Sequence, residues 1–151
     1  MRQIKTIFIP FCYTCHMIIL SLIIILNSIG AAISLYILRQ KTTKQKLVCI
    51  IGKDCNEVVT SKYASFFGIP NELMGLGYYV FFVTISLLIQ THITTLFSIP
   101  LSEVRMLAAF GSLLFSLYLT YLQLFVLKKF CEYCLAINIV NLLLFLLLFL
   151  S

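Results

Sequence analysis

The chain contains 151 residues, of which 62% are hydrophobic and 11% are charged. Soluble domains are only about half apolar, so this composition excludes an ordinary soluble protein and indicates an integral membrane protein. The formal net charge of +6 comes largely from basic residues in short loops, where they report membrane topology or contact with anionic lipid. Stacking aromatic residues are not interleaved with these charges as on a nucleic-acid surface, and we expect no nucleic-acid binding.

The apolar runs predict an all-α fold, an integral membrane bundle of four transmembrane helices in which residues 1–151 form a single domain. A spanning helix needs about 20 apolar residues, so the chain has room for about four spans and their loops. The first run, at residues 17–38, is longer than the roughly 7 to 15 residue apolar core of a signal peptide, and we interpret it as a span. A polar loop that is rich in basic residues follows at residues 39–62.

Within this loop the sequence predicts a short helix at residues 55–67, which would lie over the bundle as a lid. Residues 52–54 are typical of a turn, and Asp54 followed by Glu57 three residues later matches a capping box. The helix is expected to stop at Gly68.

The remaining spans are predicted at residues 71–90, at residues 103–127, and from Cys131 to the last residue. A short turn at residues 98–100 connects the second span to the third. Because an even number of spans places both termini on one side, the first loop and the loop between the third and fourth spans share the other side. These two loops therefore meet at one face of the membrane.

Six cysteines occur as three close pairs, which are Cys12 with Cys15, Cys49 with Cys55, and Cys131 with Cys134. No cluster of His, Asp or Glu accompanies them in the sequence, and the two CxxC motifs do not have the spacing of a zinc ribbon. We therefore expect redox chemistry rather than a metal site. The second and third pairs fall on the two loops that share one face.

Cys55 and Cys131 are both expected at a helix N-terminus, where the partial positive charge lowers the pKa of a thiol. The i, i+3 spacing of Cys131 and Cys134 puts both sulfurs on one side of a helical turn, where a disulfide can form and break. The wider spacing of Cys49 and Cys55 suits a mobile pair that meets an outside partner and passes electrons inward. The alternative that each pair is a static structural disulfide stays open, although a CxxC at a helix start favours the relay.

Electrons that reach Cys134 inside the membrane need an acceptor. The sequence contains no flavin, nicotinamide or P-loop fingerprint. A lipid-soluble quinone, either ubiquinone or menaquinone, is therefore the expected electron-accepting substrate. It would lie between the helices beneath the lid.

Four segments occur in a fixed order along the chain: Cys49 to Cys55, Val58 to Tyr63, Phe67 to Pro70 (Phe-Gly-Ile-Pro), and Cys131 to Cys134. In this order they resemble the vitamin K epoxide reductase family, specifically its bacterial-type quinone-reducing members. The resemblance covers most of the chain from the first span onward and implies quinone reduction rather than epoxide reduction.

The resemblance implies a series of exchanges that begins at a thioredoxin-fold oxidase of the DsbA type. That partner gives electrons to Cys49, Cys55 then attacks Cys131, and Cys134 is left facing the quinone. Many bacterial members carry a fused thioredoxin-like domain, and here we expect a separate partner protein acting on a monomer.

The resemblance also implies two residues that bind the quinone. Ser61 occupies the position of a serine that lines the quinone pocket, and Asn138 stands where animal members carry a pocket tyrosine. Helix back-bonding by Ser61 and an interhelical hydrogen bond from Asn138 are the structural alternatives.

Two other functions are weighed against this one. The first is a non-catalytic membrane thiol protein, such as a metal carrier or assembly protein. The second is a haem carrier, because Cys12, Cys15 and His16 spell the CxxCH motif of c-type haem attachment. That motif abuts a span with no soluble haem domain around it, so we expect Cys12 and Cys15 to have no part in the chemistry.

Two rules predict opposite orientations of the chain in the membrane. Lys and Arg are concentrated on the side that carries the second and third cysteine pairs, and the positive-inside rule places such a side in the cytoplasm. Stable disulfide formation is rare in a reducing cytosol. We therefore expect a multi-pass protein of the cell (inner) membrane with its active face on the periplasmic or extracellular side.

Overall fold

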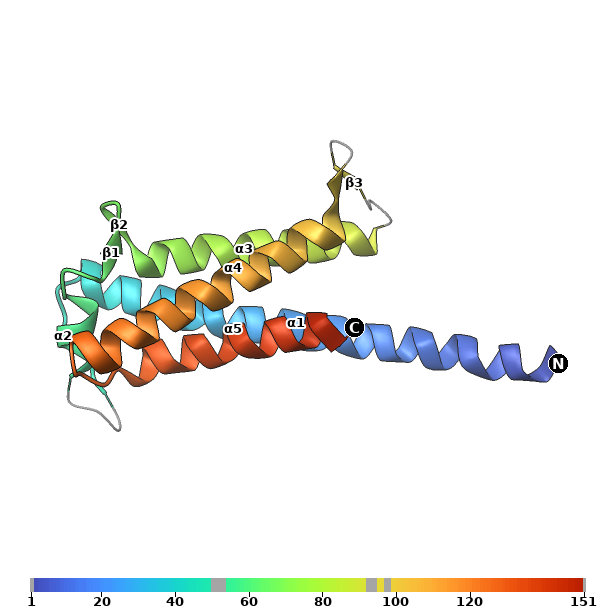
Figure 1. Ribbon diagram of the computed structural model, residues 1–151, viewed down its shortest axis with the longest axis horizontal. Helices are drawn as coiled ribbons and strands as arrows, with labels where there is room; N and C mark the ends of the chain where they lie inside the picture. Colours follow the sequence, from blue (N-terminus) through green and yellow to red (C-terminus); the bar gives the residue numbers. More distant parts are fainter. Residues whose placement is uncertain (1, 50–53, 92–94, 97–98, 151) are drawn as a thin grey trace.

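The computed structural model describes residues 2–49, 54–91, 95–96 and 99–150, with side chains from residue 17 onward except at 96 and 99. Four long helices run side by side (Figure 1), and each has a stretch that is long and apolar enough to span a membrane. The predicted all-α bundle of four transmembrane helices is therefore confirmed. The helices are α1 (Arg2–Thr42), α3 (Asn71–Gln90), α4 (Leu101–Tyr121) and α5 (Glu132–Leu150).

The helix α1 is longer than the other three, and its N-terminal part projects beyond the bundle (Figure 1). Its apolar span, Met17–Thr42, includes the predicted span and a few residues beyond it. The helix α3 has the bounds predicted for the second span. The helix α4 continues into a π-helical turn, Leu122–Val126, which brings it close to the predicted end of the third span.

The predicted lid is much shorter than expected. The helix α2 covers only Cys55–Val59, and the chain then forms an antiparallel hairpin of strands β1 (Ser65–Phe66) and β2 (Ile69–Pro70). Phe67 and Gly68, between the strands, both have positive φ, at 52° and 81°. This is the backbone that a two-residue hairpin turn requires, so Gly68 completes a hairpin and does not cap a helix.

The predicted capping box at the start of α2 is wrong. Asp54 does precede the helix, but its side chain makes no capping hydrogen bond. The carboxylates of Asp54 and Glu57 contact Lys129 instead. The predicted turn at residues 52–54 falls mostly on residues outside the described part of the chain.

A second short hairpin, β3 (Thr95–Leu96) with β4 (Ile99–Pro100), joins α3 to α4 at the opposite end of the bundle (Figure 1). The predicted turn at residues 98–100 lies here, and its first residue is outside the described part. One buried apolar cluster lies within the bundle and is made of Ile23, Tyr79, Phe82, Ala109, Val140 and Leu144. A second lies at the α2 end, where the cysteines are.

Candidate functional site

The four cysteines of the predicted relay come together at one end of the bundle. Cys55 and Cys131 are fully buried in the same apolar cluster, and Cys49 and Cys134 pack against it. The loop after α1 supplies the first pair, while the segment that enters α5 supplies the second. The topology argument from an even number of spans therefore agrees with the structure.

The outer pair, Cys49 and Cys55, forms a disulfide with a Cα–Cα distance of 6.0 Å. Cys55 is the first residue of α2 and has no exposed surface, whereas Cys49 is partly exposed. The backbone N–H of Cys55 also points to the Cys49 sulfur, at 3.2 Å. An approaching thiol therefore reaches the sulfur of Cys49 before that of Cys55.

The inner pair, Cys131 and Cys134, consists of two thiols whose sulfurs lie 2.9 Å apart. A hydrogen bond from the Cys134 side chain lowers the pKa of the Cys131 thiol, and backbone N–H groups of the first helical turn act in the same direction. Burial and the Glu132 carboxylate raise that pKa but do not outweigh the hydrogen bonds. Cys131 is thus the member of the pair whose thiolate is stabilised, as its place at the start of α5 predicts.

A basic residue joins the two cysteine-bearing segments. The Lys129 ammonium lies 3.3 Å from a carboxylate oxygen of Asp54 and 3.2 Å from one of Glu57. These carboxylates flank Cys55 in sequence, and Lys129 stands two residues before Cys131. Hydrogen bonds to Glu57 and Asp54 raise the pKa of Lys129, so it keeps its charge. The sequence interpretation assigned the two acids to a helix cap, and it missed this bridge.

Two further hydrogen bonds hold the inner pair in place. The Tyr133 hydroxyl, which lies within the CxxC motif, donates to the carbonyl of Val48 at 2.9 Å. The buried amide of Gln123, in the π-helical turn, donates to the carbonyl of Cys131 at 3.2 Å. The first bond fixes the inner motif against the residue that precedes Cys49.

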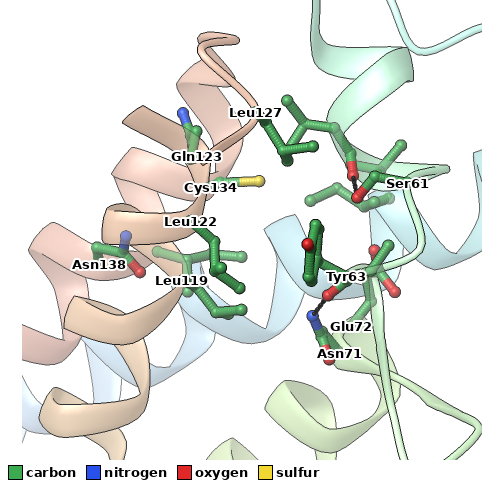
Figure 2. A pocket seen from close by; sticks show the side chains of 15 residues that line it. Ser61, Tyr63, Asn71, Glu72, Leu119, Leu122, Gln123, Leu127, Cys134 and Asn138 are labelled. Carbon is green, nitrogen blue, oxygen red and sulfur yellow. Dashed lines mark hydrogen bonds between the residues drawn. The ribbon is translucent and has the colours of Figure 1, made fainter. Parts of the chain in front are cut away.

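A pocket lies beside the inner pair, between α2, α3, the end of α4 and α5 (Figure 2). The sulfur of Cys134 points into it, and Ser61 and Asn138 are among the side chains around it (Figure 2). The structure therefore brings the two predicted quinone-binding residues to the same pocket as the inner cysteine. Most of the other lining residues are apolar, among them Ile37, Val58, Val59, Leu119, Leu122, Leu127 and Ile137.

Both structural alternatives for these residues are also realised. The Ser61 hydroxyl donates to the carbonyl of Val58 at 2.8 Å, and the Asn138 amide donates to the hydroxyl of Thr120 on α4. The serine oxygen keeps acceptor capacity, and so does the carbonyl of the asparagine side chain. Lining the pocket and making a local hydrogen bond are therefore compatible roles.

The pocket has polar residues that the sequence interpretation did not single out. Glu72, at the start of α3, is buried and forms an ion pair with Lys41 at 3.3 Å. Asn71 donates a hydrogen bond to the carbonyl of Tyr63 at 2.9 Å. The signal that could have identified them is polarity at the end of a span, because an ionisable residue there usually has a structural partner or a function.

A second cavity, of about 360 Å³, continues from this pocket along α3 and α4 and shares Asn71, Leu119, Ile137 and Asn138 with it. Its walls include Met74, Tyr78 and Phe115. At its edge, the Tyr79 hydroxyl donates to Asn141 at 2.9 Å, and the Asn141 amide donates to Ser116 at 2.6 Å. These bonds satisfy polar groups that would otherwise be costly in the membrane interior.

Cys12 and Cys15 lie in the first part of α1, where side chains are outside the described residues. Since α1 is continuous to Thr42, the rise of about 1.5 Å per residue separates Cys15 from that end by roughly 40 Å. The N-terminal pair is therefore too far away to exchange directly with either pair of the site.

A four-span bundle that carries a disulfide next to a thiol pair defines a membrane protein suited to thiol-disulfide chemistry. The sequence pattern of the vitamin K epoxide reductase family matches residues 10–149. Because this match covers nearly the whole chain, the protein belongs to that family and is a membrane thiol oxidoreductase. The family resemblance inferred from the sequence is confirmed.

Proposed function

We propose that the protein oxidises a separate thioredoxin-fold partner of the DsbA type and transfers the electrons to ubiquinone or menaquinone, thereby driving disulfide bond formation. The observation that carries the proposal is the arrangement of the two pairs in one buried cluster, with Cys55 and Cys131 at its centre. A closed outer pair beside an open inner pair is the state expected after electrons have moved inward and before they have left.

The cycle conserves electrons at each step. A partner thiolate attacks the Cys49 sulfur and releases Cys55 as a thiolate. The second thiol of the partner then resolves the mixed disulfide, so that the partner leaves oxidised and the outer pair is reduced. The inner pair meanwhile passes two electrons and two protons to the quinone substrate and closes into a disulfide.

The inward step then returns the protein to the observed state. The Cys55 thiolate attacks Cys131 and forms a Cys55–Cys131 disulfide, while Cys134 leaves as a thiolate. Cys49 attacks Cys55 in turn and releases Cys131. The lowered pKa of Cys131 supports this order, because a thiol of lower pKa is the better leaving group in the last exchange.

The pocket beside Cys134 fits a quinone head group in its chemistry. Its walls are mainly apolar, and the polar atoms of Ser61 and Asn138 are available to orient a carbonyl. The second cavity continues toward the middle of the bundle with apolar and aromatic walls, which suit an isoprenoid tail. We assign quinone binding to Ser61 and Asn138 on these grounds.

The principal test is quinone reduction by the purified protein with a reduced thioredoxin-fold partner. Replacing any of the four relay cysteines by serine should abolish turnover, while replacing Cys12 and Cys15 should leave it intact. A Cys49→Ser variant with quinone should accumulate the Cys55–Cys131 disulfide, which peptide mapping under non-reducing conditions detects. Stoichiometric metal, with no quinone reduction even after a chelator has removed it, would instead favour the alternative, a non-catalytic thiol or metal-carrier protein.

We place the protein in the cell (inner) membrane with the cysteine face on the periplasmic or extracellular side, against the count of basic residues. An impermeant maleimide applied to intact cells after reduction should label Cys49, in a variant that lacks Cys12 and Cys15. A Thr95→Cys variant provides the matched control, because Thr95 lies at the opposite end of the bundle. Labelling of Thr95→Cys without labelling of Cys49 would show that the cysteine face is cytoplasmic.

A further inference from the structure

A carboxylate from the inner motif lies next to the outer cysteine pair. The sulfurs of Cys49 and Cys55 and a carboxylate oxygen of Glu132 all lie within 4.8 Å of one another. They come from the loop after α1, from the start of α2 and from the first turn of α5. Cys55 is buried, whereas Cys49 and Glu132 are partly exposed, so the cluster is open to ions on one side.

Once the disulfide is reduced, these three donors are close enough together to reach one tetrahedral ion. Zinc binds thiolate sulfur at about 2.3 Å and carboxylate oxygen at about 2.0 to 2.2 Å. Donors around one such ion are therefore roughly 3.5 to 3.8 Å apart, which a thiol pair and a carboxylate within this radius can adopt through side-chain rotation. Two thiolates with one carboxylate favour zinc, because copper(I) prefers sulfur alone and magnesium prefers oxygen alone.

We propose that Cys49, Cys55 and Glu132 bind one Zn²⁺ ion when the outer disulfide is reduced, with water as the fourth ligand. Reduction adds two electrons and two protons to the pair, and the ion then displaces the two thiol protons. Both sulfurs are held by the metal, so Cys55 cannot attack Cys131. Zinc binding is independent of the proposed function, whereas its consequence, a halted relay, rests on it.

The sequence favoured redox chemistry over a metal because no acidic cluster accompanies the cysteines along the chain. Glu132 is distant from the outer pair in sequence, and the fold brings the two together. The nearby acids Asp54 and Glu57 are already paired with Lys129. Among the described residues, Glu132 is the carboxylate that lies within 4.8 Å of both sulfurs.

The test measures Zn²⁺ binding to the full chain, by competition with a chromogenic chelator, in a variant with Cys12, Cys15, Cys131 and Cys134 changed to serine. We expect one ion per chain after phosphine reduction and none after reoxidation. Glu132→Gln should weaken binding by about tenfold or more, the smallest loss typical of disturbing a metal's ligand environment. Glu103→Gln is the matched control, since Glu103 occupies the first turn of α4 as Glu132 occupies that of α5.

Equal zinc binding by the reduced and oxidised proteins, or unchanged affinity in Glu132→Gln, would overturn the proposal. If the four-serine variant does not fold, the two glutamine variants are compared in the otherwise unaltered chain, using the Co²⁺ charge-transfer band of thiolate ligands. A band that persists at full strength in Glu132→Gln counts against the site. Neither readout uses a quinone or a partner, so loss of zinc binding with intact quinone reduction rejects only the metal site. Intact zinc binding with loss of quinone reduction rejects only the relay.

Discussion

A close fit between α1 and α3 gives a prediction about the bundle that holds the site. A Cβ atom added to Gly30 of α1 would lie 2.3 Å from Cζ of Tyr79 and 2.6 Å from both Cε1 and Oη. Tyr79 cannot easily move aside, because it is 1% exposed and its hydroxyl donates to Asn141 on α5. Gly30→Ala must therefore displace the ring or separate α1 from α3.

The expected cost of Gly30→Ala has three contributions. Carbon atoms in contact normally lie about 3.5 to 4.0 Å apart, so the ring has to move by more than roughly 1 Å. Overpacking of this kind costs about 1–3 kcal/mol, and loss of the Tyr79–Asn141 hydrogen bond in a membrane adds about 0.6 kcal/mol. Better helix propensity returns about 1 kcal/mol. We expect a net loss of about 0.6–2.6 kcal/mol in the free energy of unfolding.

The matched control is Gly77→Ala on α3, where an added Cβ meets no atom within 4 Å. It should be neutral or stabilising, because alanine gains the same helix propensity without the clash. Reversible unfolding in detergent micelles measures both variants. A second measurement repeats Gly30→Ala in a Tyr79→Leu background, where the penalty should shrink. Equal effects of the two glycine variants, or an unchanged penalty without the tyrosine ring, would refute the Gly30–Tyr79 contact.

Two predictions concern the relay itself. Lys129→Gln removes the ion pairs to Asp54 and Glu57, so inward electron transfer measured by stopped flow should become slower and lose much of its salt dependence. Lys128→Gln is the control and should behave as wild type. Equal slowing by both variants would contradict a role for the Lys129 ion pairs. The lowered pKa of Cys131 means that its thiolate forms as pH rises through a value below that of an ordinary thiol. In titrations that follow the ultraviolet absorbance of the thiolate, Cys134→Ala should raise this midpoint and Glu132→Gln should lower it. A midpoint that does not change in Cys134→Ala would exclude the hydrogen bond from Cys134 as the cause of the lowered Cys131 pKa.

The spans were predictable because the bilayer imposes a length and a composition on any helix that crosses it. Residues 71–90 form one helix with the predicted bounds. The prediction of a lid helix at residues 55–67 was wrong for a local reason. The apolar residues of this segment have helical spacing, but the helix ends at Val59. There the Thr60 hydroxyl bonds back to the Asn56 carbonyl at 2.7 Å, and Phe67 with Gly68 adopts a hairpin turn.

The candidate site was predictable only where its members are close in sequence. The spacing of Cys131 and Cys134 indicates a sulfur pair on one helical turn, and the structure has one. The bridge from Lys129 to Asp54 spans 75 residues, and the bond from Tyr133 to Val48 spans 85. A local sequence pattern cannot predict these two contacts, because each contact depends on how the two loops meet in the folded bundle.

Three kinds of interaction hold α2 over the inner pair, and the differences between them suit a relay. A five-residue helix has little stability of its own, so its position depends on the disulfide, on buried Val58 and Val59, and on Lys129. The apolar contacts of Val58 and Val59 do not themselves involve the disulfide. The exposed ion pairs are screened by salt and individually weak, so they align the segment without preventing it from opening to a partner. Reduction removes the disulfide constraint, and alignment of Cys55 with Cys131 then depends on the apolar contacts together with the lysine bridge, at the stage when the proposed attack takes place.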